Sequence, residues 1–194
     1  MSKIKVVAFN GSPWSGGNTA TLVDWAFAAL EAQGIETELY DLAGQDICGC
    51  QVCRGYVKSS EGVCPDGERQ VDSWMSRMVA ADGILLASPV HHATITDELK
   101  AVMDRCGRIE RLRGNLLERK AGAGIVAARR AGSLQALDTI NRFFTIHRMI
   151  VPGTSQWNVG IGEARGEVEK DAEGRRAMTE LGNAMAWLIK TIQG

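Results

Sequence analysis

Residues 10–19 read Asn10-Gly11-Ser12-Pro13-Trp14-Ser15-Gly16-Gly17-Asn18-Thr19 and connect an apolar run over 4–9 to a helical pattern over 19–33. A strand that enters a glycine- and hydroxyl-rich turn and then a helix is a suitable phosphate site. The first N–H groups of a helix have no intrahelical partners, and the helix dipole favours an anion. The stretch therefore predicts a nucleotide cofactor.

The alternation of strand and helix patterns continues along the rest of the chain. Strands are predicted at 4–9, 36–41, 83–88, 122–128 and 149–151, and helices at 19–33, 68–81, 96–108, 134–146 and 171–192. Parallel strands joined by crossover helices on both faces form a doubly wound, three-layer α/β sandwich with a five-stranded sheet. We expect one domain over 1–194, with ligands bound beyond the carboxyl ends of the strands.

Composition narrows the range of partners. The 194 residues carry 22 Lys and Arg against 23 Asp and Glu, so the net charge of −1 predicts binding neither to nucleic acid nor to an anionic membrane. No apolar run reaches the roughly 20 residues that span a bilayer, and the first residues lack a signal-peptide pattern. We expect a cytoplasmic protein, in which an odd number of cysteines argues against a disulfide framework.

The first of three loops at the predicted strand ends is the quoted stretch. It contains no Lys or Arg, so it is neither a P-loop nor a Rossmann glycine loop. Neutral donors at a helix start suit a single phosphate monoester, although a solvated loop with Asn18 or Thr19 as helix cap is an alternative. The candidate ligands in this loop are Ser12, Trp14, Ser15, Gly17, Asn18 and Thr19.

The second and third loops follow the strands predicted at 83–88 and 122–128. Proline and small residues hold a backbone in an open turn, where main-chain groups can contact the edge of a flat ring. The histidines of the second loop either flank that ring or are solvated, and the arginines of the third loop have the same two interpretations. The candidates are Pro89, Val90, His91, His92, Ala93 and Thr94 in the second loop, and Arg129, Arg130 and Gly132 in the third.

Several segments together resemble the NAD(P)H-dependent FMN reductases of flavodoxin-like fold, including their iron-sulfur flavoprotein branch. The resemblance implies an FMN whose phosphate lies on Ser12, Ser15, Asn18 and Thr19, with its ring against 89–94 and with 129–132 on the other side. The residues that carry the resemblance are Gly11-Ser12-Pro13, Gly17-Asn18-Thr19, Ala81-Asp82-Gly83, Ser88-Pro89-Val90, Leu99-Lys100-Ala101, Asp104-Arg105, Phe143-Phe144, His147, Met149, Gly166, Asp171 and Glu173-Gly174.

Two positions depart from the family pattern. Trp14 stands where members often have Arg, which removes a charged phosphate contact, and we expect Trp14 to contact the flavin or a second subunit. His91-His92 stands where members often have Tyr-Phe, so ring stacking gives way to groups that donate hydrogen bonds or carry charge.

The resemblance also implies a reaction and an assembly. FMN would accept a hydride from NAD(P)H and pass electrons to a small acceptor such as free flavin or a quinone. This chemistry needs no acid or base side chain, so no catalytic residue is assigned, and backbone N–H groups of 90–93 are expected to face the ring. Relatives complete the flavin site across a dimer interface, which predicts a homodimer or a dimer of dimers, with 154–170 covering the flavin.

Four cysteines after the second predicted strand leave a second function open. Cys48, Cys50, Cys53 and Cys64 are as many thiols as a cubane cluster requires. The iron-sulfur branch has Cys-x-x-Cys as the first interval, whereas this chain has Cys-x-Cys, so we favour free thiols and no metal site. An electron carrier with FMN and a cluster is the alternative function, and a flavin-binding regulatory module without turnover is a third. Cys106 is predicted to lie in the core.

Overall fold

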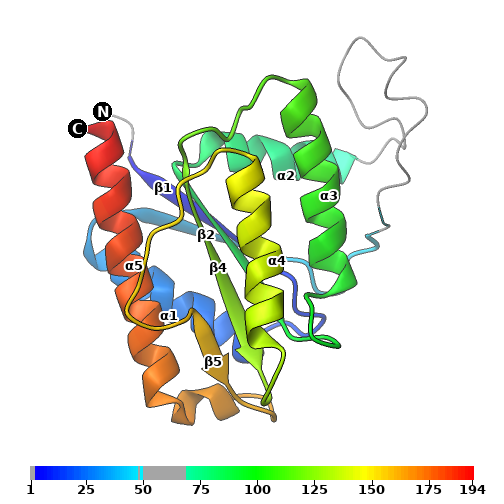
Figure 1. Ribbon diagram of the computed structural model, residues 1–194, viewed down its shortest axis with the longest axis vertical. Helices are drawn as coiled ribbons and strands as arrows, with labels where there is room; N and C mark the ends of the chain where they lie inside the picture. Colours follow the sequence, from blue (N-terminus) through cyan, green and yellow to red (C-terminus); the bar gives the residue numbers. More distant parts are fainter. Residues whose placement is uncertain (1–2, 48, 50–68) are drawn as a thin grey trace.

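The computed structural model describes residues 3–47, 49 and 69–194. Its centre is a five-stranded parallel sheet in the order β2-β1-β3-β4-β5, with helices on both faces (Figure 1). The strands are β1 (Lys5–Asn10), β2 (Glu36–Asp41), β3 (Gly83–Pro89), β4 (Ala121–Ala128) and β5 (Val159–Ile161). The three-layer α/β sandwich predicted from the sequence is therefore confirmed.

The helices divide into two layers. One layer contains α1 (Asn18–Ala32) and α5 (Ala172–Gln193), and the other contains α2 (Arg69–Ala80), α3 (Asp97–Leu112) and α4 (Ser133–Ile146). In Figure 1, α1 and α5 lie on one side of the sheet and α2, α3 and α4 lie on the other. A short 3-10 helix, η1 (Glu167–Lys170), precedes α5.

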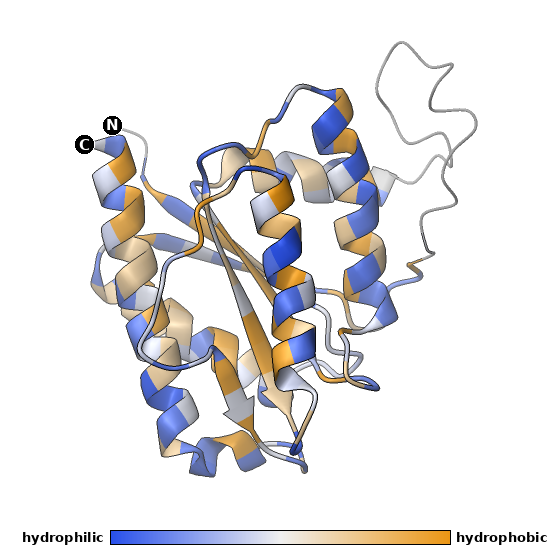
Figure 2. Cartoon of the chain, in the orientation of Figure 1, coloured by the Kyte–Doolittle hydropathy of each residue, from blue (hydrophilic) through white to orange (hydrophobic). Residues whose placement is uncertain are grey.

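Alternating side chains of the central strands build two separate cores. Val7 and Phe9 of β1 pack toward α2, α3 and α4, whereas Val6 and Ala8 pack toward α1 and α5, and all four are fully buried. A strand covered on both faces must be apolar throughout, which is why β1, β3 and β4 appear as continuous apolar runs in the sequence. Figure 2 shows the same contrast, with apolar strands between helices whose outer faces are hydrophilic.

The fifth strand is not where the sequence predicted it. At 149–151, Ile150 makes only an isolated bridge to Ala121, and Pro152, which follows this segment, has no N–H to extend a ladder. The edge strand is instead β5, within the segment 154–170 that we expected to cover the flavin. Its central residue, Gly160, packs closely on α1, because a Cβ there would lie 2.5 Å from Cδ2 of Leu22 and would force that buried side chain to move.

No helix in the described part of the chain combines the length and the apolar character that crossing a bilayer requires.

Candidate functional site

Loops after four parallel strands meet at one edge of the sheet and enclose a pocket of about 400 Å³. This is within the size range of small-molecule and cofactor sites. The loops that follow β1, β3 and β4 are the three expected from the sequence, and the loop after β5 is a fourth. The pocket is lined by Ser12, Pro13, Trp14, Gly17, Asn18, Thr19, Pro89, Val90, His91, Ala127, Arg129, Gly162, Glu163 and Arg165.

Buried hydrogen bonds join the first two loops. The N–H of Gly11 donates to Ala87 O of β3 at 2.8 Å, and the hydroxyl of Thr96 donates to Gly11 O at 2.7 Å. Thr96 also caps α3, and its own N–H donates to the Ser88 hydroxyl. Because Thr96 and Ser88 are fully buried, this network fixes the spacing between the turn over 11–17 and the loop after β3.

The start of α1 is an open anion site. Its N-cap is Gly17, which provides no side-chain acceptor for the first helical N–H groups, and the first turn contains no acidic residue. Neither Asn18 nor Thr19 is the cap, so the alternative in which one of them serves that purpose is wrong. An uncapped N-terminus leaves its N–H groups available to an external anion.

Ser12 shapes the turn that leads to this site. Its hydroxyl both accepts from the Trp14 N–H and donates to the Trp14 carbonyl, while its own N–H donates to the side chain of Asn10. Trp14 lines the pocket and is 74% exposed. The side chain therefore lies at the mouth of the pocket, where our prediction of a flavin or subunit contact still applies.

Asn18 connects the first loop to the loop after β5. Its side-chain amide donates to the carbonyls of Gly162 and Ala164, at 3.2 and 2.9 Å, and its oxygen accepts from the Val168 N–H. The amide group is thus occupied by protein carbonyls. Asn18 faces the pocket mainly as a backbone N–H donor at the start of α1, and its side chain positions the neighbouring loop.

The loop after β5 brings two charged residues that the sequence reasoning missed. Arg165 donates to the carbonyls of Ser15 and Gly16, at 3.2 and 3.3 Å, and Glu163 forms an ion pair with Arg129 at 3.1 Å. The rule that ligand-binding loops follow the carboxyl ends of parallel strands, already used for the other loops, could have found them. Had the last strand been placed at 159–161, residues after Ile161 would have been expected at the same edge.

The loop after β3 contains a tight turn. His91 and Thr94 exchange two backbone hydrogen bonds, and the two residues between them, His92 and Ala93, both have positive φ, at 45° and 63°. Positive φ at both central positions defines a type I′ turn, which normally requires Gly or Asn. His92 and Ala93 both carry a Cβ, so this conformation strains their backbone. Contacts around the turn must hold it in place.

Gly132 holds that turn from the third loop. It has φ of +86°, and a Cβ at this position would lie 2.8 Å from Ala93 Cα and 3.0 Å from Val90 Cγ1. Only glycine allows the two loops to approach so closely. Gly132 therefore contributes to the site by packing, and it does not line the pocket itself.

The structure brings most of the predicted ligands together. Nine of them line the pocket: Ser12, Trp14, Gly17, Asn18, Thr19, Pro89, Val90, His91 and Arg129. The other six lie in the same three loops outside its lining: Ser15, His92, Ala93, Thr94, Arg130 and Gly132. The predicted cluster ligands Cys48, Cys50, Cys53 and Cys64 lie outside the described residues.

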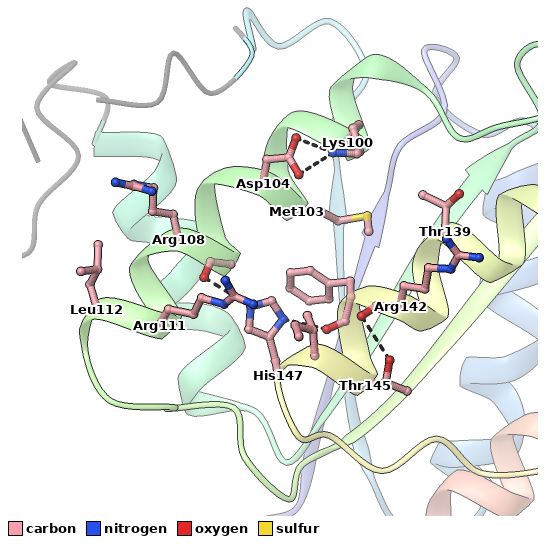
Figure 3. Close-up of a pocket in the computed structure, with 13 residues that line it drawn as sticks. Lys100, Met103, Asp104, Arg108, Arg111, Leu112, Thr139, Arg142, Thr145 and His147 are labelled. Carbon is pink, nitrogen blue, oxygen red and sulfur yellow. Dashed lines mark hydrogen bonds and ion pairs between the residues drawn. The ribbon is translucent and has the colours of Figure 1, made fainter. Parts of the chain in front are cut away.

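A second, more open groove of about 1050 Å³ lies between α3 and α4 (Figure 3). Its lining includes Met103 and Phe143 together with basic side chains such as Arg111 and Arg142. All of its lining residues come from these two helices and the residue after α4, and none from the loops at the strand ends. The pocket at the strand ends is therefore the candidate cofactor site.

The residues of that pocket fit a flavin mononucleotide. The uncapped helix start suits a terminal phosphate, because its N–H groups need an acceptor. Pro89, Val90 and His91 line the same pocket, where their loop can contact the edge of a ring. The N–H groups of Val90 and His91 donate to Ala127 O and Thr94 O, so these two are not free to face the ring as the sequence predicted. Donors for a phosphate and a loop that can contact a ring are thus both present, contributed by different strand ends.

Comparison with known proteins agrees with this interpretation. The family model described as NADPH-dependent FMN reductase matches residues 4–164. An iron-sulfur flavoprotein of Methanocaldococcus jannaschii is 36% identical over 199 residues, covering 98% of this chain and 100% of the relative. An iron-sulfur flavoprotein of Methanosarcina thermophila is 27% identical over 192 residues, covering 98% and 97% of the two chains.

Solved structures show the fold. RosB, crystallised with 8-demethyl-8-formylriboflavin-5'-phosphate, superposes with a TM-score of 0.80 at 16% identity, covering 98% of this chain and 80% of its own. A flavodoxin from the domain Archaea superposes with a TM-score of 0.63 at 13% identity, covering 96% and 99%. From the family match and these likenesses we conclude that the chain is an FMN-binding oxidoreductase of flavodoxin-like fold and belongs to the NADPH-dependent FMN reductase family.

Proposed function

We propose that this protein takes electrons from NAD(P)H onto FMN and delivers them to a small acceptor, such as free flavin or a quinone. The observation that carries the proposal is that the uncapped N-terminus of α1 and the loop over 89–91 line one pocket. That arrangement would hold the phosphate at one end and leave a ring at the open mouth. Family membership supports the same reaction.

FMN, when bound, supplies the two-electron chemistry, since its ring accepts a hydride from a nicotinamide and passes electrons onward. The protein's part is binding and orientation. The first N–H groups of α1 would hold the phosphate, and the loop over 89–91 would contact and orient the ring edge. No side chain is assigned as acid or base, so the reaction depends on how these loops are positioned.

The test is an anaerobic titration of the purified, FMN-loaded protein with NADH and then with NADPH. We expect one of the two to bleach the visible flavin absorbance, and a panel of flavins and quinones to restore it with turnover. If neither nucleotide bleaches the flavin, the NAD(P)H dependence is wrong. Bleaching without turnover on any acceptor would favour a binding or regulatory role.

A second candidate is an electron carrier that holds an iron-sulfur cluster beside FMN. The names of the two iron-sulfur flavoproteins, one of them 36% identical to this chain, favour it. The cysteines concerned are Cys48, Cys50, Cys53 and Cys64. Iron and acid-labile sulfide after anaerobic purification decide the matter, because about four of each per chain would support the cluster and values near zero would exclude it.

We also propose a homodimer or a dimer of dimers as the working assembly. Trp14, an exposed aromatic side chain at the mouth of the pocket, supports this, because aromatic residues are enriched at protein interfaces. Sedimentation of the FMN-loaded protein measures its mass. A monomer at working concentration would contradict the proposal.

A further inference from the structure

We propose that Arg165 is the cationic ligand of the FMN phosphate in this protein. The loop over 10–19 contains no basic residue, so its own donors are neutral. Arg165 comes from a distant segment, the loop between β5 and η1, and lines the same pocket. The assignment rests on FMN occupying this pocket, as the proposed function requires.

The guanidinium of Arg165 lies directly against the turn over 11–17. Its Nη2 donates to Ser15 O at 3.2 Å and its Nε donates to Gly16 O at 3.3 Å. A guanidinium has five N–H donors in a fixed plane, so these two bonds leave others for a ligand. The contact also orients the arginine, which reduces the side-chain entropy that phosphate binding would otherwise cost.

The backbone that presents Arg165 is held from two directions. The Asn18 amide donates to Ala164 O at 2.9 Å, directly before Arg165. Glu167 accepts from the N–H groups of Glu163 and Ala164, at 2.9 and 3.0 Å. Arg165 therefore extends from a braced turn, and its contact with the first loop is part of a built arrangement.

The charges around the pocket favour Arg165 over Arg129 as the phosphate partner. Arg129 already pairs with a carboxylate, that of Glu163, with 3.1 Å between Nε and Oε2. Within the described residues, Arg165 bonds only to carbonyl oxygens and has no carboxylate partner at ion-pair distance. An arginine without a counter-ion beside an uncapped helix start provides the positive charge that a phosphate dianion requires.

The test compares FMN with riboflavin, which has the same ring and no phosphate. Flavin fluorescence titration of the full-length protein gives the Kd of each for wild type, R165Q and R148Q. Arg148 is a matched control, because it is an exposed arginine that pairs with Glu118 and does not line the pocket. We expect R165Q to raise the Kd for FMN about 10- to 100-fold and to leave the Kd for riboflavin within about twofold. R148Q should change neither.

Equal effects of R165Q on both flavins, or no effect on either, would overturn the assignment. A wild-type protein that binds neither flavin would instead overturn the proposed function, so the two failures are distinguishable. R165K provides a second measurement in case R165Q is unstable. R165K should retain most of the preference for FMN over riboflavin, and added salt should weaken that preference. A preference that does not change with salt would contradict a charged contact.

Discussion

The hydroxyl of Thr96 donates a hydrogen bond to the carbonyl oxygen of Gly11 across 85 positions of sequence. Thr96 is the N-cap of α3, and Gly11 begins the turn that leads to α1. This bond therefore joins the segments that enter two helices packed on opposite faces of the sheet. The contact is tight, because a Cβ on Gly11 would lie 2.9 Å from the same hydroxyl oxygen. The two loops that we propose to bind the two ends of FMN are therefore joined directly.

Replacement of Thr96 by valine should destabilise the protein. The variant retains the shape of the side chain but removes the α3 cap and leaves the Gly11 carbonyl without this donor. We expect a loss of about 1–3 kcal/mol in the free energy of unfolding, measured by urea denaturation. T179V is the matched control, since that hydroxyl is exposed and bonds only within α5, and a change as large as that of T96V would contradict this explanation.

Replacement of Gly132 by alanine should displace the turn at 91–94. Gly132 combines positive φ with a Cβ position 2.8 Å from Ala93 Cα, whereas Gly34 has positive φ and open space. G34A should therefore cost about 1 kcal/mol and G132A roughly 3 kcal/mol, as measured by thermal unfolding. G132A should also weaken FMN binding. Equal costs for the two variants would show that the loop contact contributes nothing.

Replacement of Asn18 by alanine should loosen the segment that presents Arg165. It removes the donor to Gly162 O and Ala164 O and the acceptor for the Val168 N–H. Hydrogen exchange of peptides over 162–168 should become faster, with about 1–2 kcal/mol of lost stability. N183A, an exposed residue of α5, serves as the control, and unchanged exchange at 162–168 in N18A would contradict the bracing role.

Acid pH should destabilise the turn over 163–167. The N–H groups of Ala164 and Glu163 lower the pKa of Glu167 below its ordinary value. A carboxyl group with a lowered folded-state pKa stabilises the fold above its unfolded pKa, and this contribution is lost as pH falls through the lowered value. NMR titration should show the amide shifts of Glu163 and Ala164 changing below the ordinary Glu pKa of about 4.3. In E167Q the same amides should not titrate.

The thiol of Cys106 should be inert in the folded protein. Complete burial raises its pKa to about 12, so almost no thiolate forms near neutral pH. Iodoacetamide at pH 8 should leave the Cys106 peptide unmodified, as measured by mass spectrometry, and should modify it after unfolding in guanidinium chloride. Rapid modification of the native protein would show that α3 opens at this position.

Most of the fold was predictable from local pattern. The segments that became β1, β3 and β4 are apolar throughout because both of their faces are covered, and the helices between them carry a 3.6-residue pattern. The fifth strand was mispredicted because the apolar residues at 149–151 resemble a strand more closely than 159–161 does. Pro152 prevents the segment at 149–151 from extending as a strand, and Gly160 interrupts the apolar pattern of 159–161.

The site was predictable to the extent that it follows strand ends. Nine predicted residues line the pocket because parallel strands place their carboxyl ends at one edge. Arg165 was not predicted, since it lies far in sequence from the loop it contacts and follows the misplaced strand. The roles of Asn18 and Gly132 likewise depend on contacts with distant loops.

The sequence by itself determined the three-layer architecture, the glycine- and hydroxyl-rich turn before the first helix and the sheet edge at which the strand-end loops gather, because periodicity and local turn chemistry encode them. Only the tertiary structure decided that the first helix starts without a side-chain cap, which charged residue contacts the turn before it and which glycine allows a neighbouring loop to approach. Those features depend on distances between segments remote in the chain, such as Ser15 and Arg165, and no local pattern records such distances.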